Sequence, residues 1–151
     1  MHYTDFITLR DARKIAAGLR TVDRLEAAAL HGLYSDDDIV RVLRATRGGH
    51  TLFNNRHAIG AFGIAESPDP QVGLPWLIGT DDMAAGWVVL AREARQVFAR
   101  LSAPFTVLTN VMLASNTLHR RFIDWLLRPE WSTVDEAAGI VRFYQCVSPS
   151  P

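Results

Sequence analysis

The sequence predicts a single domain of the α/β (α+β) class, in which a central mixed sheet of about six or seven strands is flanked by helices. The chain has 151 residues, which suits one hydrophobic core. Apolar residues make up 48% and charged residues 21% of it, as in ordinary globular proteins. The spacing of the apolar residues changes along the chain between a helical period and a two-residue period. We therefore expect one domain over residues 1–147, followed by a flexible Ser/Pro tail at 148–151.

The first third of the chain carries mostly helical spacing. We expect a short strand at 6–9, then a helix whose buried face is Ala12, Ile15, Ala16 and Leu19. Thr21 is placed to cap a second helix. Its inward face would consist of Val22, Leu25, Ala28 and Ala29. Ser35 with Asp38 resembles a capping pair, and it predicts a third short helix with apolar positions at Ile39, Val42 and Leu43.

The pattern changes to strands after Gly48 and Gly49, which break the chain. Residues 51–54 and 58–65 read as two strands joined near Asn55. Residues 72–79 form a third apolar strand, in which Pro75 suggests a sheet edge or a bulge because proline cannot donate to the ladder.

The second half contains the clearest amphipathic helix. Its apolar face repeats at helical spacing through Trp87, Leu90, Ala91, Ala94, Val97, Phe98 and Leu101. A buried strand is expected at 105–112, and Ser115 or Asn116 should cap a further helix that stops before Pro129. Its core face would be Leu118, Phe122, Trp125 and Leu126. Residues 131–134 and 140–147 predict a closing hairpin around Gly139.

Composition excludes several classes of function. The formal net charge is zero, whereas proteins that bind nucleic acid usually carry a basic footprint. Cys146 is the only cysteine, so no intramolecular disulfide can form and a reducing compartment fits best. We find no N-terminal signal peptide and no apolar stretch long enough to span a bilayer. The expected location is therefore inside a cell, or inside a particle assembled in one.

Two short segments resemble known proteins. Residues 115–122, Ser-Asn-Thr-Leu-His-Arg-Arg-Phe, resemble the Asn-Thr-Ser-His-x-Arg-Phe-Leu segment of internal virion proteins of short-tailed phages. Residues 76–82, Trp-Leu-Ile-Gly-Thr-Asp-Asp, resemble their Trp-Phe-Val-Thr-Ser-Asp segment. Those proteins are described as acetyltransferase-like, and the order of predicted elements here is that of the GCN5-related N-acetyltransferase (GNAT) fold. The resemblance therefore implies a GNAT-like fold over the whole chain.

The resemblance also points to a cofactor loop. In working GNAT enzymes, a glycine-rich turn before a main helix lets backbone amides approach the pyrophosphate of coenzyme A. The corresponding residues that would bind acetyl-CoA, if the chain binds it, are Thr80, Met83, Ala84, Ala85, Gly86 and Asn116. The turn has one glycine, and Asp81 and Asp82 put negative charge where the pyrophosphate would lie. We therefore expect these aspartates to cap the helix and no cofactor to bind.

The expected catalytic groups depart from the family as well. Ile123 stands where the family usually has a tyrosine that serves as general acid, and no Asp or Glu lies within 72–79 to serve as base. His119 and Tyr144 are weak catalytic candidates. His119 has a side chain whose ordinary pKa suits a base, but beside Arg120 and Arg121 we expect it to face solvent or a partner.

Other polar clusters have simpler explanations. His50, His57 and His119 match no standard metal spacing, so we predict no metal site. The acidic run at residues 36–38 is explained by stabilisation of a helix start. Arg92, Arg95 and Arg100 would line a solvated helix face.

These observations lead to a functional expectation with two alternatives. The first is a catalytically degenerate GNAT-like internal virion protein that helps to assemble the core of a phage head. Its partners would be other virion proteins, its location the virion or the host cytoplasm, and it could form oligomers. The alternative is an active or atypical N-acetyltransferase that uses acetyl-CoA on a small amine or a protein. A third possibility is a bacterial adaptor with the same fold.

Overall fold

A computed structural model describes residues 2–147, apart from the side chains of residues 86–90. The predicted tail at 148–151 lies outside these described residues. The elements follow the predicted order, from one strand through three helices and three strands to a helix, a strand, a helix and two strands. They are β1 (His2–Thr4), α1 (Leu9–Ala17), α2 (Thr21–His31), α3 (Asp36–Ala45), β2 (His50–Asn54), β3 (His57–Glu66), β4 (Val72–Gly79), the 3₁₀ helix η1 (Asp81–Gly86), α4 (Trp87–Ser102), β5 (Val107–Leu113), α5 (Thr117–Leu127), β6 (Glu130–Asp135) and β7 (Ile140–Cys146).

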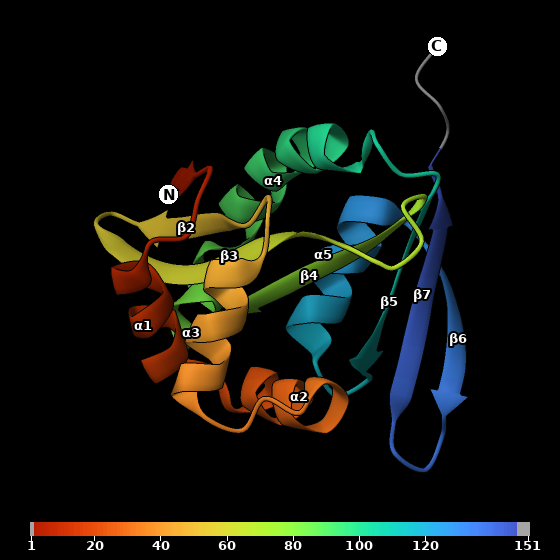
Figure 1. Ribbon diagram of the computed structural model, residues 1–151, viewed down its shortest axis with the longest axis horizontal. Helices are drawn as coiled ribbons and strands as arrows, with labels where there is room; N and C mark the ends of the chain where they lie inside the picture. Colours follow the sequence, from red (N-terminus) through yellow and green to blue (C-terminus); the bar gives the residue numbers. More distant parts are fainter. Residues whose placement is uncertain (1, 148–151) are drawn as a thin grey trace.

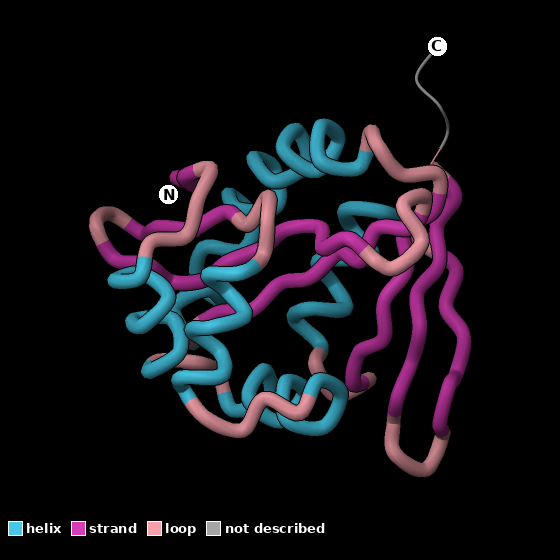
Figure 2. Tube along the Cα trace, in the orientation of Figure 1, coloured by secondary structure: helices cyan, strands magenta, loops and turns pink. Residues whose placement is uncertain are grey.

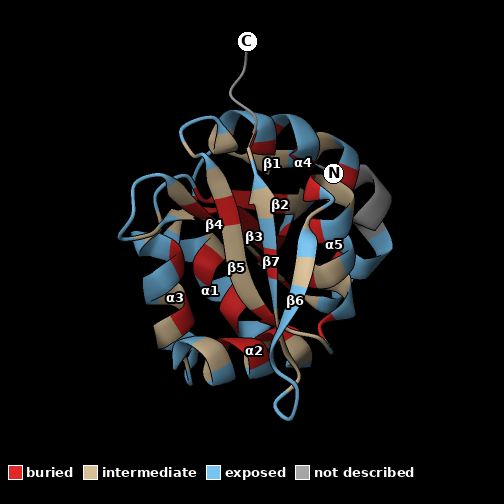
Figure 3. Cartoon of the chain, turned by 90° about the vertical axis from the view of Figure 1, so that its right-hand side faces the viewer, coloured by how far each residue is buried: buried red, intermediate tan, exposed pale blue. Residues whose placement is uncertain are grey.

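One mixed sheet organises the molecule, as the sequence predicted. Its seven strands lie in the order β1-β2-β3-β4-β5-β7-β6, and only β4 and β5 run parallel to each other. Figures 1 and 2 show α1 and α3 on one face of the β2–β4 half, with α4 on the other. β6 is the outermost strand, and five of its six residues are exposed, as Figure 3 shows.

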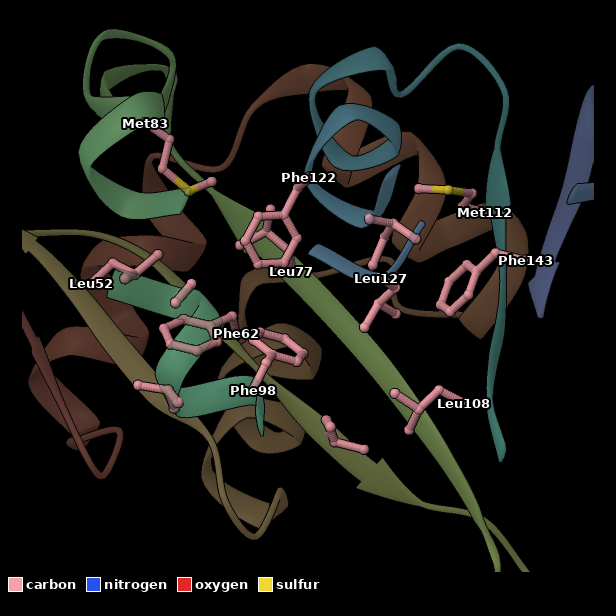
Figure 4. Close-up of a cluster of buried hydrophobic side chains, with 14 of the residues drawn as sticks. Leu52, Phe62, Leu77, Met83, Phe98, Leu108, Met112, Phe122, Leu127 and Phe143 are labelled. Atoms are coloured by element: carbon pink, nitrogen blue, oxygen red, sulfur yellow. The ribbon is translucent and has the colours of Figure 1, made fainter. Parts of the chain in front are cut away.

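Two hydrophobic clusters hold these layers together. The larger lies under α4 and α5, where the rings of Phe62, Phe98 and Phe122 pack against one another in series (Figure 4). The smaller lies between α1, α3 and the other face of the sheet, and includes Ile15 and Ile39. Burial of each such side chain contributes about 1.5–3 kcal/mol to folding, so both faces of the sheet are fixed by packing.

The sheet splits between β4 and β5. The two strands pair only at their first residues, Val72 with Val107 and Gly73 with Leu108, and Figure 1 shows them separating toward their far ends. Pro75 lies where they part: its carbonyl faces β5 and accepts a 3.0 Å hydrogen bond from the Asn110 side chain. Because proline has no N–H, the strand offers β5 no donor at this position. The Asn110 side chain therefore replaces ordinary strand pairing at the start of the split.

Three local predictions are wrong. Residues 6–9 form no strand: the carbonyls of Phe6 and Ile7 accept hydrogen bonds from the side chains of Thr51 and Arg44, and α1 begins at Leu9. Pro75 lies in an inner strand, where its missing N–H falls on the split side and leaves the pairing with β3 intact.

The third error concerns α2. Its N-cap is Arg20 rather than Thr21, and no side-chain cap bond forms there. The buried residues are Asp23, Glu26 and Ala27, whereas Leu25 is 58% exposed. The helix is therefore turned so that its carboxylates point into the protein.

The remaining predicted elements are present, but the predicted core face of α5 is only partly correct: Phe122 is buried, whereas Leu118, Trp125 and Leu126 are partly buried. Ser35 and Asp38 form a reciprocal capping box at the start of α3. Asn55 takes a positive φ in the β2–β3 turn, as Gly139 does in the β6–β7 hairpin. Ala91, Ala94, Val97 and Phe98 of α4 are buried as expected. The side chains of Trp87 and Leu90 lie outside the described residues.

Candidate functional site: a cavity beside the split in the sheet

Two carboxylates on one face of α2 lie at the split. Asp23 and Glu26 are three residues apart, which places them on the same side of a helix. They are 1% and 6% exposed. Buried carboxylates must be fully hydrogen-bonded to be tolerated in a folded protein, and their partners explain why this helix face is turned inward.

Asp23 joins α2 to the end of β4 and to α5. Its Oδ2 accepts from the backbone N–H of Gly79 at 2.8 Å and from Nε of Arg20 at 3.0 Å. Its Oδ1 accepts from Arg20 Nη2 at 2.6 Å and from Asn116 Nδ2 at 2.8 Å. The bidentate arginine compensates the charge of this carboxylate.

Glu26 joins α2 to the end of β5. Its Oε2 accepts from the backbone N–H of Leu113 at 2.8 Å. Its Oε1 accepts from Asn116 Nδ2 at 3.2 Å and lies 3.0 Å from Nδ1 of His119. Asp23 and Glu26 together therefore bridge the separated ends of β4 and β5, and we call this pair the carboxylate clip.

The clip binds His119 through Nδ1 of its ring and leaves the other ring nitrogen, Nε2, unbonded among the described residues. The residue is 4% exposed, so the prediction that it faces solvent or a partner is wrong. Because a carboxylate can only accept, Nδ1 of His119 is the donor to Glu26. Nε2 is buried and has no hydrogen-bond partner among the described residues. A neutral imidazole in this tautomer presents a lone pair at Nε2.

A cavity of about 340 Å³ lies beside the clip. α2, α3 and the outward-facing residues of β4 form most of its wall, and β5 and α5 close the end where His119 lies. The apolar side chains of the wall are Ala27, Leu33, Ile39, Val42, Leu43, Ala65, Leu74, Trp76, Leu77, Ile78 and Val111. The polar ones are Asp23, Glu26, His31, Thr46, Asn110 and His119.

His31 is the other titratable histidine of this wall. It lies at the exposed end of α2, and the partial burial of its ring lowers its pKa below the ordinary value. The nearby Glu26 carboxylate raises that pKa in opposition, while His119 lowers it. The balance favours a neutral ring, so His31 adds no positive charge to the cavity near neutral pH.

The α1–α2 connection covers the edge of β4 at its last residue, Gly79. The backbone N–H of Arg20 donates to the carbonyl of Gly79 at 2.9 Å, and Leu19 forms a bridge with Thr80. Asp23 takes the N–H of Gly79. Both backbone groups that Gly79 presents to the split are therefore bonded within the protein.

The predicted cofactor residues have other roles or no contacts. Met83 is fully buried, and its sulfur lies so close to Gly60 and Gly79 that a Cβ at either glycine would overlap it. It is a core residue (Figure 4). Ala84 and Ala85 are exposed. Gly86 is one of the residues whose side-chain environment the structure does not describe.

The other predicted cofactor residues are occupied by the protein itself. Thr80 donates its N–H to Ile59. Asn116 is the predicted cap of α5, where its Oδ1 accepts from the N–H of His119 at 3.3 Å. Its amide nitrogen serves the clip, so the side chain is fully used.

The remaining candidates lie apart from the cavity. Tyr144 is 45% exposed on β7, outside the cavity wall, and Cys146 is exposed on the same strand. His50 stacks on Phe62 near β1, and His57 is exposed at the start of β3. Among residues 2–147, no group of three metal-binding side chains comes together, and no helix is long and apolar enough to cross a membrane.

Solved structures with a similar fold identify the architecture. An acetyltransferase from Thermus thermophilus has a TM-score of 0.65 and 17% identity over 97% of this chain and 98% of its own. The aminoglycoside 6′-N-acetyltransferase of Enterococcus faecium has a TM-score of 0.62 and 10% identity over 100% and 99%. The chain has the GNAT acetyltransferase fold. No protein-family model and no curated protein matches the sequence.

A third similar structure contains a cofactor. It is AAC(6′)-Ib in complex with ribostamycin and coenzyme A, with a TM-score of 0.64 and 12% identity over 97% of this chain and 94% of its own. The residues of this chain do not fit such a group well. The exposed carboxylates of Asp81 and Asp82 stand before α4, and the edge of Gly79 is already paired. An anion placed there would be repelled, and the β4 edge offers no free N–H at Gly79.

Proposed function

We propose that this chain uses the GNAT fold as a non-catalytic structural protein, of the kind found inside phage particles. One position on the β4 edge carries the proposal: Gly79 donates to Asp23 and accepts from Arg20, so a donor substrate finds no free backbone group at Gly79. Opening this edge would take the Gly79 N–H from Asp23 and the Gly79 carbonyl from the Arg20 N–H, which costs about 1–3 kcal/mol for each buried group left unpaired. Under this proposal, the fold serves to present surfaces that bind other proteins.

Two further features support this proposal. Ile123, at the position where the resemblance expects a tyrosine, is fully buried in the larger hydrophobic cluster and offers no proton. The exposed aspartates of η1 leave an acidic surface where a pyrophosphate would need positive or neutral donors. The motif resemblance to internal virion proteins supplies the proposed partners, which are other proteins of the particle.

Calorimetry with acetyl-CoA tests the non-catalytic proposal. We expect no binding at millimolar ligand, both for the natural chain and for the variant in which Asp81 and Asp82 are replaced by asparagine. Urea denaturation of both proteins checks that they are folded. Micromolar binding by the natural chain would overturn the proposal. Binding by the variant alone would show that charge, and not the pairing of Gly79, excludes the cofactor.

A second experiment tests the proposed location. Phage particles purified from infected cells of the source host should contain the chain, and it should resist added protease until the particles are opened. A matched preparation of emptied particles serves as control. Finding the chain only in the soluble fraction of the lysate would contradict an internal virion role.

The second candidate function is N-acetyl transfer to a small amine or to a protein. The similar solved structures support it better than the structural role, because they are acetyltransferases. The specific observation in its favour is His119, whose Nε2 is unpaired while Glu26 orients the ring from Nδ1. A histidine held in this way can accept a proton from an attacking amine.

Acetyl-CoA supplies the acetyl group in this chemistry, and release of its thiol is the measurable product. Under this candidate, a panel of amines should give thiol release that His119→Asn abolishes. Unchanged thiol release in the variant would remove His119 from the reaction. No release with any amine would leave the structural proposal as the supported function.

A further inference from the structure

Helices α4 and α5 pack against each other and form a basic surface (Figure 3). Together with the C-cap of α5, they contain two acidic residues and six arginines, which are Arg92, Arg95, Arg100, Arg120, Arg121 and Arg128. The net charge of the whole chain is zero because it also counts the acidic residues of the turns and of the other elements. A local basic surface is therefore present in a chain that is neutral as a whole.

No carboxylate pairs with these arginines. Among residues 2–147, each ion pair that forms involves other basic residues, such as Arg24 of α2 with Asp36. Of the two acidic residues on α4 and α5, Asp124 accepts a 2.6 Å hydrogen bond from the indole N–H of Trp131, and Glu93 is partly buried. The positive charge of this surface is therefore available to an anion from outside the chain.

Trp125 joins arginines of both helices into one surface. The guanidinium of Arg95, from α4, lies 4.3 Å from the centre of the Trp125 ring and donates to the Trp125 carbonyl at 3.1 Å. Arg92 lies one turn before Arg95 on α4. Arg121 lies four residues before Trp125 on the same side of α5, and Arg128 is the C-cap of that helix. These four arginines are exposed, and we call them the arginine face.

The uncharged residues around the arginine face indicate which anion it fits. No large apolar side chain is exposed on α5 or on residues 91–102 of α4, whereas protein interfaces and membrane-bound helices both need one. Trp125 and Trp131 each have an arginine guanidinium over the ring, so neither ring is placed to stack on the bases of a single strand. Gln96 and Thr117 are the exposed uncharged polar residues of this part of the chain, and they offer few contacts to the 2′-hydroxyls of duplex RNA.

We propose that the arginine face binds the phosphate backbone of double-stranded DNA without reading its sequence. An arginine guanidinium can donate two parallel hydrogen bonds to one phosphate. Arg121 and Arg128 are seven residues apart, which is about 10 Å along a helix and about three phosphates along one DNA strand. This binding uses neither the cavity nor an acetyl donor, so it is independent of which of the two functions proposed above is correct.

Fluorescence anisotropy with a short labelled DNA duplex tests the proposal. We expect a dissociation constant below about 100 µM at low salt, and a log–log salt slope of about −3 to −4, the value for four phosphate contacts. Polyglutamate should bind at least tenfold more weakly, and an RNA duplex of the same length should bind no more tightly than DNA. No anisotropy change at about 100 µM of folded protein would overturn the proposal. Equal or tighter binding of polyglutamate, or tighter binding of RNA, would also overturn it.

Matched variants locate the binding, and urea denaturation checks that each is folded. Replacing Arg92 and Arg121 together by glutamine should weaken DNA binding at least tenfold and make the salt slope shallower by about 2. Replacing the same two residues by lysine should keep the slope, because the number of charges is unchanged. The control replaces Arg10 and Arg13 by glutamine, which removes two exposed charges from α1 on the opposite face of the sheet and should keep the slope as well. An unchanged slope in the first variant, or an equal loss in the control, would reject the arginine face as the site.

Discussion

Helices α2 and α3 lie side by side in the sequence and bury opposite kinds of surface. α3 turns Ile39 and Leu43 into the smaller cluster and keeps its acidic residues at the surface, in the capping box and in an ion pair between Asp36 and Arg24. α2 buries two carboxylates and leaves Leu25 in water. Hydrophobic spacing predicted the buried face of α3 correctly and the buried face of α2 incorrectly.

The difference lies in what each helix packs against. α3 faces α1 and apolar side chains, so water exclusion decides its orientation. α2 faces the split, where the N–H groups of Gly79 and Leu113 and the amide of Asn116 need acceptors. Satisfying buried donors decides its orientation, because three unmet donors at about 1–3 kcal/mol each together cost more than one exposed leucine at about 1.5–3 kcal/mol. The following predictions test this account from the largest expected effect to the smallest.

Removing a carboxylate of the clip should have the largest effect. Asp23→Ala leaves Arg20 buried without a counter-charge and strips Gly79 of its acceptor, so we expect a loss of about 3–5 kcal/mol of unfolding free energy. The matched change on α3, Asp36→Ala, removes an exposed ion pair and should cost at most about 1 kcal/mol. Urea denaturation measures both, and similar losses in the two variants would refute the assigned role of the clip.

Truncating an apolar side chain should reverse the order of the two helices: the larger loss of stability should now come from α3 and the smaller from α2. Ile39→Ala empties a packed position on α3 and should cost about 2–5 kcal/mol. Leu25→Ala removes an exposed side chain from α2 and should change stability by about 0.5 kcal/mol or less. The same denaturation experiment applies. A large loss for Leu25→Ala would restore the orientation of α2 that the sequence pattern suggested.

Removing the cap of α3 should have a moderate effect. Ser35→Ala loses the hydrogen bond that the serine hydroxyl accepts from the N–H of Asp38, at a cost of about 1 kcal/mol. Thr21→Ala on α2 serves as control and should be nearly neutral, since the side chain of Thr21 is not the cap. If the two variants lose equal stability, the capping difference between the helices is not real.

The smallest expected effect concerns pH. His31 has a folded-state pKa lowered mainly by burial, so the unfolded chain, with an ordinary value of about 6.5, binds the proton more readily. Its contribution to stability is therefore present above that value and is lost as pH falls through it toward the folded-state pKa. His31→Gln should lose less melting temperature than the natural chain between pH 7.5 and 5.5. An equal loss would show that His31 does not titrate differently on folding.

Much of the fold could be predicted because it rests on local chemistry. The capping box at Ser35, the turns at Asn55 and Gly139, and the apolar repeat of α4 each depend on neighbours within a few residues. The resemblance of residues 115–122 to acetyltransferase-like proteins led to the fold that the solved structures share. The candidate site could not be predicted in the same way: His119 was singled out, but Asp23 and Glu26 were missed. Their spacing of three residues beside Ala27 was the available signal.

The sequence by itself determined the order of elements, because this follows from residue type and periodicity; the resemblance to a known fold added the mixed sheet and the departures at Asp81, Asp82 and Ile123. Only the tertiary structure decided which face of α2 is buried, that Met83 belongs to the core, and that His119 meets Glu26. The physical reason is sequence separation: Glu26 and His119 are 93 residues apart. Their pairing exists only because β4 and β5 part and leave buried donors that α2 must satisfy.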